Sequence, residues 1–94
     1  MDHETDLREA RALWQRGELE EAERTLRAII RAEPTHAAAT HELGALLVQA
    51  GQQRLGISLL KRANSLEPTA SGLNDLGMAY VASSNIAEAL TAFR

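Results

Sequence analysis

Apolar residues recur along this chain at the three- and four-residue spacing of helices that bury one face. The pattern predicts six helices, at residues 5–16, 18–32, 36–50, 53–66, 70–83 and 86–94. Glycine readily adopts the left-handed conformation that ends a helix, and a residue before proline is pushed out of the helical region. Gly17 and Gly51 therefore end the first and third helices. Pro34 and Pro68 end the second and fourth.

Polar residues predict where two further boundaries lie. Thr35 precedes the third helix and can cap it. Ser84 and Asn85 are expected to form the turn between the last two helices, because Asn85 and Glu88 have the spacing of a capping box. The pattern stops at Arg94, inside the sixth helix, so we expect the chain to be a piece of a longer protein.

The helices repeat with a period of 33 or 34 residues. Leu43-Gly44 returns as Leu76-Gly77 after 33 residues, and Pro34 returns as Pro68 after 34. Small residues also recur in the paired helices, as Ala10, Gly44 and Gly77 in the first of each pair and as Ala22, Gly56 and Ala89 in the second. A glycine inside a helix costs about 1 kcal/mol relative to alanine, so these positions predict close helix crossings. A period of this length indicates a stack of helical hairpins.

Composition favours helices and argues against nucleic-acid binding, secretion and a membrane span. Hydrophobic residues make up 45% of the chain but aromatic residues only 3%, which favours a helical core of Leu, Ile, Val and Ala over a sheet. The net charge of −3 gives no broad attraction to nucleic acid. The acidic N-terminus does not have the apolar run of a secretory signal, and no stretch approaches the roughly 18 apolar residues of a membrane span. We expect a cytoplasmic protein.

The residues that could carry catalysis or bind a metal are not arranged to do so. The chain contains no cysteine, which excludes disulfides and thiolate metal sites. His36 and His41 are five residues apart, not the four that bring two imidazoles to one helix face. The acidic residues at 18–23 fit a solvated helix face, because nothing near them in the sequence would raise a pKa. We expect no metal and no cofactor, and no nucleophile–base pair or phosphate loop indicates an enzyme.

These residues resemble the tetratricopeptide repeat, a 34-residue helix–turn–helix unit. The middle unit matches the family pattern at Leu43, Gly44, Leu47, Gly56, Leu60, Ala63 and Pro68. The third matches at Leu73, Leu76, Gly77, Tyr80, Ala89 and Phe93, and the first matches best over residues 17–22, at Leu26 and at Pro34. The departures are Glu9-Ala10, where Leu-Gly is usual, Thr40, and one residue that is missing between Pro68 and Leu76. The resemblance implies a right-handed α-solenoid of about 2.5 repeats, one domain over residues 1–94 with units of about 3–36, 37–69 and 70–94.

Members of the family bind an extended peptide or a partner helix in a concave groove lined by the first helices. The resemblance implies groove positions at Arg11, Trp14, Gln15, His41, Ala45, Val48, Gln49, Asn74 and Met78, with Leu7, Ala38, Ser71, Val81 and Ala82 beside them. Leu7, Val48 and Val81 could instead complete the core, and Trp14 fits either a ligand anchor or core packing. The clamp that holds a terminal carboxylate in some members needs basic or amide residues where this chain has Glu42 and Asp75, so that clamp is absent. The asparagine ladder of other members is absent for the same reason.

Three functions remain open. The first is a protein–protein interaction module. The second is the N-terminal arm of a larger bacterial enzyme, such as a glycosyl-, sulfo- or methyltransferase. The third is a self-associating structural module: nothing follows Ile86, Leu90 and Phe93 to cover them, so we expect the last helix to fray or to bury itself in another copy.

Overall fold

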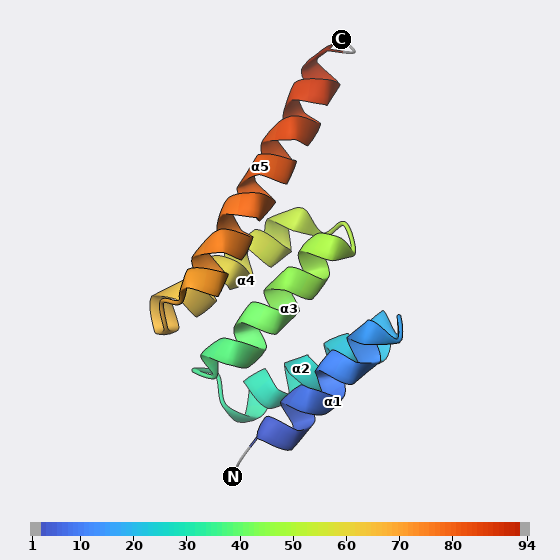
Figure 1. The fold of residues 1–94 in the computed structure, drawn as a ribbon, viewed down its shortest axis with the longest axis vertical. Helices are drawn as coiled ribbons and strands as arrows, with labels where there is room; N and C mark the ends of the chain where they lie inside the picture. The colour runs from blue at the N-terminus through green and yellow to red at the C-terminus, as the bar shows by residue number, and fades with distance from the viewer. Residues whose placement is uncertain (1–2, 93–94) are drawn as a thin grey trace.

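The computed structural model describes the backbone of residues 3–92 and the side chains of residues 3–83. These residues form five α-helices and no strand (Figure 1). The helices are α1 (Glu4–Gln15), α2 (Leu19–Ala32), α3 (Ala37–Gln49), α4 (Gln53–Leu66) and α5 (Ala70–Ala92). The all-α prediction is confirmed, and the first four predicted helices agree with the observed ones to within about two residues.

Two helical hairpins are made by the same turn. Gly17 and Gly51 have φ angles of 83° and 93°, the left-handed region that favours glycine. After Gly17, the amide of Glu18 donates to the carbonyl of Leu13 at 2.9 Å. After Gly51, the amide of Gln52 donates to the carbonyl of Leu47 at 2.8 Å. This six-to-one hydrogen bond closes a helix end around a glycine, so both helices end where the sequence predicted.

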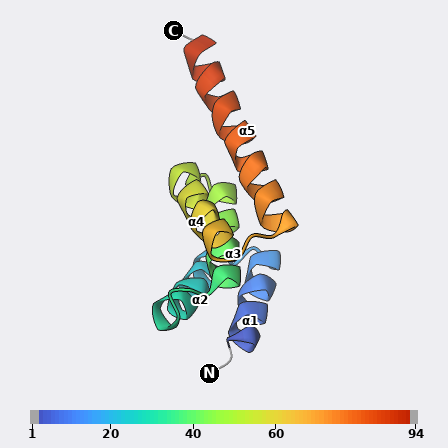
Figure 2. The same cartoon turned by 90° about the vertical axis from the view of Figure 1, so that its left-hand side faces the viewer.

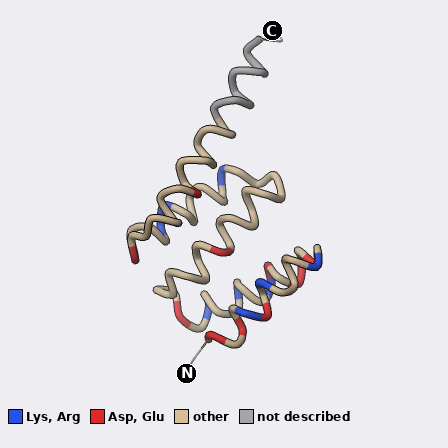
Figure 3. The backbone as a smooth tube through the Cα atoms, viewed as in Figure 1, with Lys and Arg blue, Asp and Glu red and all other residues tan. Residues whose placement is uncertain are grey.

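The hairpins stack in chain order, because α2 contacts α3 and α4 contacts α5 (Figure 2). The interior is aliphatic, with Leu26, Leu43, Leu46 and Leu47 almost completely buried among α1, α2 and α3. Charged residues gather on the first hairpin, while α3, α4 and α5 carry few (Figure 3). The result is an elongated stack, 51 × 27 × 20 Å along its principal axes.

The predicted close crossing occurs in the middle hairpin. A Cβ atom added to Gly44 would lie 2.9 Å from the carbonyl oxygen of Gly56, and one added to Gly56 would lie 2.8 Å from that of Gly44. Both distances are shorter than a real Cβ contact, so α3 and α4 approach at a separation that only glycine permits at these positions.

The predicted turn at Ser84 and Asn85 is wrong, because α5 runs through both residues as one helix to Ala92. Ser84 stands one period after Gly51, at the position where the first two units have a glycine with positive φ. A left-handed residue other than glycine costs about 1–2 kcal/mol, and no described non-glycine residue adopts that conformation. The helix therefore continues and projects beyond the other four (Figures 1 and 2). The third unit is not a hairpin, and no helix begins at Asn85, where the capping box was expected.

The cap of α3 also differs from the prediction. His36, not Thr35, is the N-terminal cap, and its Nδ1 accepts a hydrogen bond from the amide of Ala39 at 3.1 Å. Thr35 lies one residue too early, inside the turn that the amide of His36 closes on the carbonyl of Glu33. At the start of α5, Thr69 Oγ1 accepts from the amide of Gly72 at 2.9 Å.

Two further predictions concern the last helix and the possibility of a membrane span. The side chains of Ile86, Leu90 and Phe93, expected to seek cover, lie outside the described residues. Over the part of the chain that is described, no helix has both the length and the apolar character that a membrane crossing requires.

Candidate functional site

The first helices of successive units, α1, α3 and α5, line a row of neighbouring hollows. The first hollow, about 480 Å³, lies between α1 and α3. The central hollow, about 410 Å³, continues from α3 to α5 and shares Trp14 and Gln49 with the first. A third, about 580 Å³, runs along α5 and shares Met78 and Ala82 with the central one. Neighbouring hollows thus share lining residues, and we call the three together the α1–α3–α5 groove.

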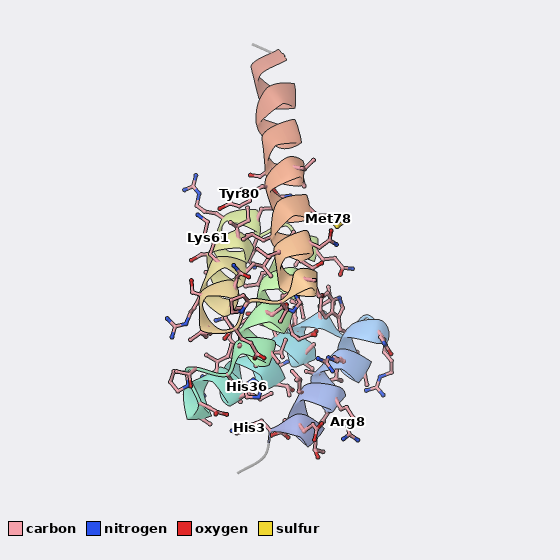
Figure 4. All side chains as sticks on the ribbon, turned by 60° about the vertical axis from the view of Figure 1, so that its left-hand side comes forward. His3, Arg8, His36, Lys61, Met78 and Tyr80 are labelled. Carbon is pink, nitrogen blue, oxygen red and sulfur yellow. The ribbon has the colours of Figure 1, made fainter. Side chains whose placement is uncertain are left out.

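The central hollow has an apolar floor. Ala45 and Val48 of α3 face Met78, Ala79 and Ala82 of α5 across it. Met78 is 63% exposed and projects from the side of α5 opposite to Tyr80 (Figure 4). Methionine is flexible and polarizable, so this floor can adapt to side chains of different shape.

Polar side chains join the helices along the groove. The indole Nε1 of Trp14 in α1 donates to Oε1 of Gln49 in α3 at 2.9 Å. Nε of Arg11 donates to Oε1 of Glu42 at 3.1 Å, an ion pair between the same two helices. These two contacts hold α1 and α3 in register along the lip of the groove.

A third contact joins α3 to α5. Nε2 of His41 lies 2.8 Å from Oδ2 of Asp75, and both side chains are partly buried. Successive first helices therefore contact each other through one polar pair or more, and each pair connects neighbouring repeats.

Trp14 combines the two roles that the sequence left open. The ring packs against the aliphatic core, yet it also lines the first and central hollows. The hydrogen bond from its indole N–H to Gln49 restrains the orientation of the ring between the core and the groove. Trp14 is therefore both a core side chain and a groove residue.

We expect the Trp14–Gln49 hydrogen bond to couple the two residues by about 0.5–1 kcal/mol, the usual size for a neutral pair. A double-mutant cycle with Trp14→Phe and Gln49→Met, followed by urea unfolding, measures this coupling. Phenylalanine retains an aromatic ring without the donor, and methionine retains the length of the side chain. Strict additivity of the two substitutions would show that the bond stabilises nothing.

The structure distributes the nine predicted groove residues unevenly. Seven line the first or central hollow, namely Arg11, Trp14, Gln15, Ala45, Val48, Gln49 and Met78. Asn74 lines the third hollow, where its Nδ2 is 3.6 Å from the sulfur of Met78. His41 lines a separate hollow of about 210 Å³ at the beginning of α5. The structure does not bring His41 into the central hollow, although its partner Asp75 lines that hollow.

The neighbouring positions separate into core and groove. Leu7 is only 7% exposed and belongs to the core, whereas Val48 is half-buried and lines the central hollow. Val81 is 60% exposed and lines the third hollow. The groove alternative therefore holds for Val48 and Val81, and the core alternative holds for Leu7.

Two residues gain a role in the groove that the sequence analysis did not assign. Glu42 and Asp75 appeared there only as the wrong residues for a carboxylate clamp, yet they hold Arg11 and His41. His41 and Asp75 are 34 residues apart, which is one repeat period. A search for polar pairs separated by about one period would have found them.

The acidic side chains also set the charge of the groove. Glu42 and Asp75 contribute two carboxylates, against which Arg11 supplies one cation. A ligand with a free carboxylate would meet repulsion there, while a ligand with neutral or basic groups would not. Among the described residues, no three His, Asp or Glu side chains gather closely enough to hold a metal ion.

Comparison with known families agrees with this architecture. The family model for the tetratricopeptide repeat matches residues 4–46, which cover α1, α2 and most of α3. Residues 4–46 belong to the tetratricopeptide repeat family. No curated protein sequence matches the chain. The resemblance inferred from the middle and third units is thus confirmed in the first, where the sequence pattern was weakest.

Two of the three departures from the tetratricopeptide pattern, at Glu9-Ala10 and Thr40, lie inside the matched stretch, and the structure accommodates them. Ala10, in place of the usual glycine, is buried in the core without disturbing the hairpin. Thr40 is fully buried, but its hydroxyl donates to the carbonyl of His36 at 2.9 Å, so no polar atom is left unsatisfied there. The tetratricopeptide repeat is a protein-interaction unit that typically serves as a non-catalytic scaffold, and the chain is an interaction module in this general sense.

Proposed function

We propose that the chain binds a peptide or a partner helix in the α1–α3–α5 groove. The observation that carries this proposal is the central hollow, where an apolar floor with the exposed Met78 adjoins the half-buried Trp14. Tryptophan is among the residues that most often anchor protein interfaces. The ligand supplies one or two apolar side chains to this floor.

The size and charge of the groove define the ligand further. A hollow of about 410 Å³ admits one or two aliphatic side chains, each of which gains about 1.5–3 kcal/mol on full burial. The carboxylates of Glu42 and Asp75 favour a neighbouring lysine, arginine or free amide on the ligand. We therefore expect an internal apolar segment with flanking basic residues, and not a free C-terminus.

Trp14 provides a direct readout of this binding, because it is the only tryptophan in the chain. A library of random dodecapeptides, displayed and selected against residues 1–94, supplies the probes. Titration with a selected peptide is expected to change the emission of Trp14, since the ligand removes water from its ring. Selected peptides that bind without altering the emission, and that bind Trp14→Phe equally well, would contradict the proposal.

The two alternative functions, an arm of a larger enzyme and a self-associating module, stay predictions. A targeting arm of a larger bacterial enzyme would use this same groove, and only a longer coding sequence separates it from an independent module. The division into repeats at 3–36, 37–69 and 70–94 and the cytoplasmic location likewise stay predictions. Self-association has an observation of its own in its favour, which is the exposed face of α5.

A further inference from the structure

Asp75 is the one charged side chain among the described residues that line the central hollow. The groove also contains Glu42, in the first hollow, but Oε1 of Glu42 accepts from Nε of Arg11 at 3.1 Å. That ion pair compensates the charge of Glu42, whose side chain is only 17% exposed. The side chain of Asp75 is 36% exposed, and no Lys or Arg of the described chain pairs with it. Of the two carboxylates, Asp75 is therefore the one that can attract a cation from a ligand.

His41 holds Asp75 by one of its two oxygens. Nε2 of His41 lies 2.8 Å from Oδ2 of Asp75, and because an ionised carboxylate only accepts hydrogen bonds, the histidine is the donor. A neutral imidazole makes this hydrogen bond without adding a charge of its own. No described residue donates to Oδ1 of Asp75. The carboxylate is thus restrained in orientation, with one oxygen left for a ligand.

A single free oxygen favours lysine over arginine as the ligand residue. The guanidinium of arginine binds a carboxylate best as a fork, in which two parallel N–H groups meet the two oxygens. His41 already donates to one of these oxygens, so a guanidinium fork on Asp75 would compete with the histidine. An ammonium group is a compact charge that needs one oxygen only and can keep its other N–H groups in water.

The position of Asp75 on α5 sets how far this cation lies from the apolar side chain of the ligand. Met78 and Ala79, which form part of the apolar floor, follow Asp75 by three and four residues. The three side chains share one face of α5, and about one helical turn, roughly 5 Å, separates the carboxylate from the floor. Two residues of an extended peptide, or three to four residues of a helix, span a comparable distance on one side.

We propose that Asp75 binds the ammonium group of a ligand lysine that stands two to four residues from the apolar residue seated on the floor. The inference rests on the proposed function, because it concerns the ligand of the same groove. It narrows the flanking basic residue to one residue type at one spacing. His41 acts through Asp75 as a positioning residue and does not itself contact the ligand.

Dodecapeptides selected against residues 1–94 give the first test. Lysine should be enriched two to four residues from an apolar residue, and arginine should be enriched less. In one such peptide, norleucine in place of this lysine keeps the aliphatic chain and removes the charge. This replacement should raise the Kd about three- to tenfold, measured through the emission of Trp14. Against Asp75→Asn, which keeps an oxygen for His41, the same replacement should change the Kd by less than about twofold.

Glu20→Gln is the matched control, because it makes the same change in net charge at an exposed residue of α2, outside the groove. It should retain the full effect of the norleucine replacement. Equal losses for the unmodified chain and Asp75→Asn would overturn the inference, while a Trp14 emission that still responds to the peptide leaves the proposed function standing. An emission that responds to no selected peptide would overturn both.

His41→Phe tests the positioning role. The variant keeps a ring of similar size but leaves both oxygens of Asp75 free for a guanidinium fork. The unmodified chain should bind the lysine peptide more tightly than the same peptide with arginine, and His41→Phe should reduce or reverse this preference. Circular dichroism checks that the variant is folded. A folded variant with an unchanged ratio of the two Kd values would show that His41 does not position Asp75.

Discussion

Replacing Gly44 with alanine is expected to lower the free energy of unfolding by about 1–2 kcal/mol, although alanine favours a helix by about 1 kcal/mol. The added Cβ would lie 2.9 Å from the carbonyl oxygen of Gly56 and 3.0 Å from the amide nitrogen of Leu60. Both atoms belong to the backbone of α4, so relief requires the whole helix to move. The steric cost therefore exceeds the gain in helix propensity.

The matched substitution, Gly77→Ala, is expected to have the opposite sign. Gly77 stands at the equivalent position of the next unit, but an added Cβ meets nothing within 4 Å there. The substitution therefore changes only the helix propensity, and the higher propensity of alanine raises the free energy of unfolding by up to about 1 kcal/mol. Urea unfolding followed by circular dichroism, at a concentration where the chain is monomeric, measures both changes. Equal effects at the two positions would show that α3 and α4 do not cross as closely as described.

Peptide binding is expected to weaken at least about tenfold when Met78 is replaced by glutamate, because a carboxylate on the apolar floor must be desolvated by the ligand. Met78 is 63% exposed, so the substitution removes little packing within the chain. The added charge would also lie near Asp75 on the wall of the same hollow. Loss of binding without loss of folding is therefore the expected result.

Leu55→Glu is the matched control. Leu55 is an exposed apolar residue of α4, 44% accessible, and it does not line the α1–α3–α5 groove. The same change in charge at this position should leave the dissociation constant unaltered. Isothermal titration of a selected peptide into both variants makes the comparison, and equal losses would mean that net charge, not the groove, controls binding.

The sequence predicted most of the fold because a few residues determine each boundary. Gly17 and Gly51 adopt the positive φ expected of them, and α2 and α4 end two residues before Pro34 and Pro68. The third hairpin was mispredicted because periodicity says where a turn belongs but not whether the chain makes it. With serine at position 84, a continued helix competes with the turn. The repeat period does not show which of the two has the lower free energy.

The groove was predicted in outline but not in its polar contacts. The sequence predicted that positions on the first helices share one face, and seven of the nine predicted residues line the first or central hollow. The pairing of His41 with Asp75 depends on how adjacent helices slide along each other, which a repeat period fixes only to within a turn. The sequence also could not decide between core and groove for Trp14, because the ring reaches both.

The most direct test of the account is an amide chemical-shift map of residues 1–94 during titration with a selected peptide. The account predicts that the shifts concentrate on the groove-lining residues of α1, α3 and α5, with the largest near Trp14, Val48 and Met78. The outward faces of α2 and α4 should change little. Shifts centred on α2 and α4, with the groove residues unaffected, would contradict it.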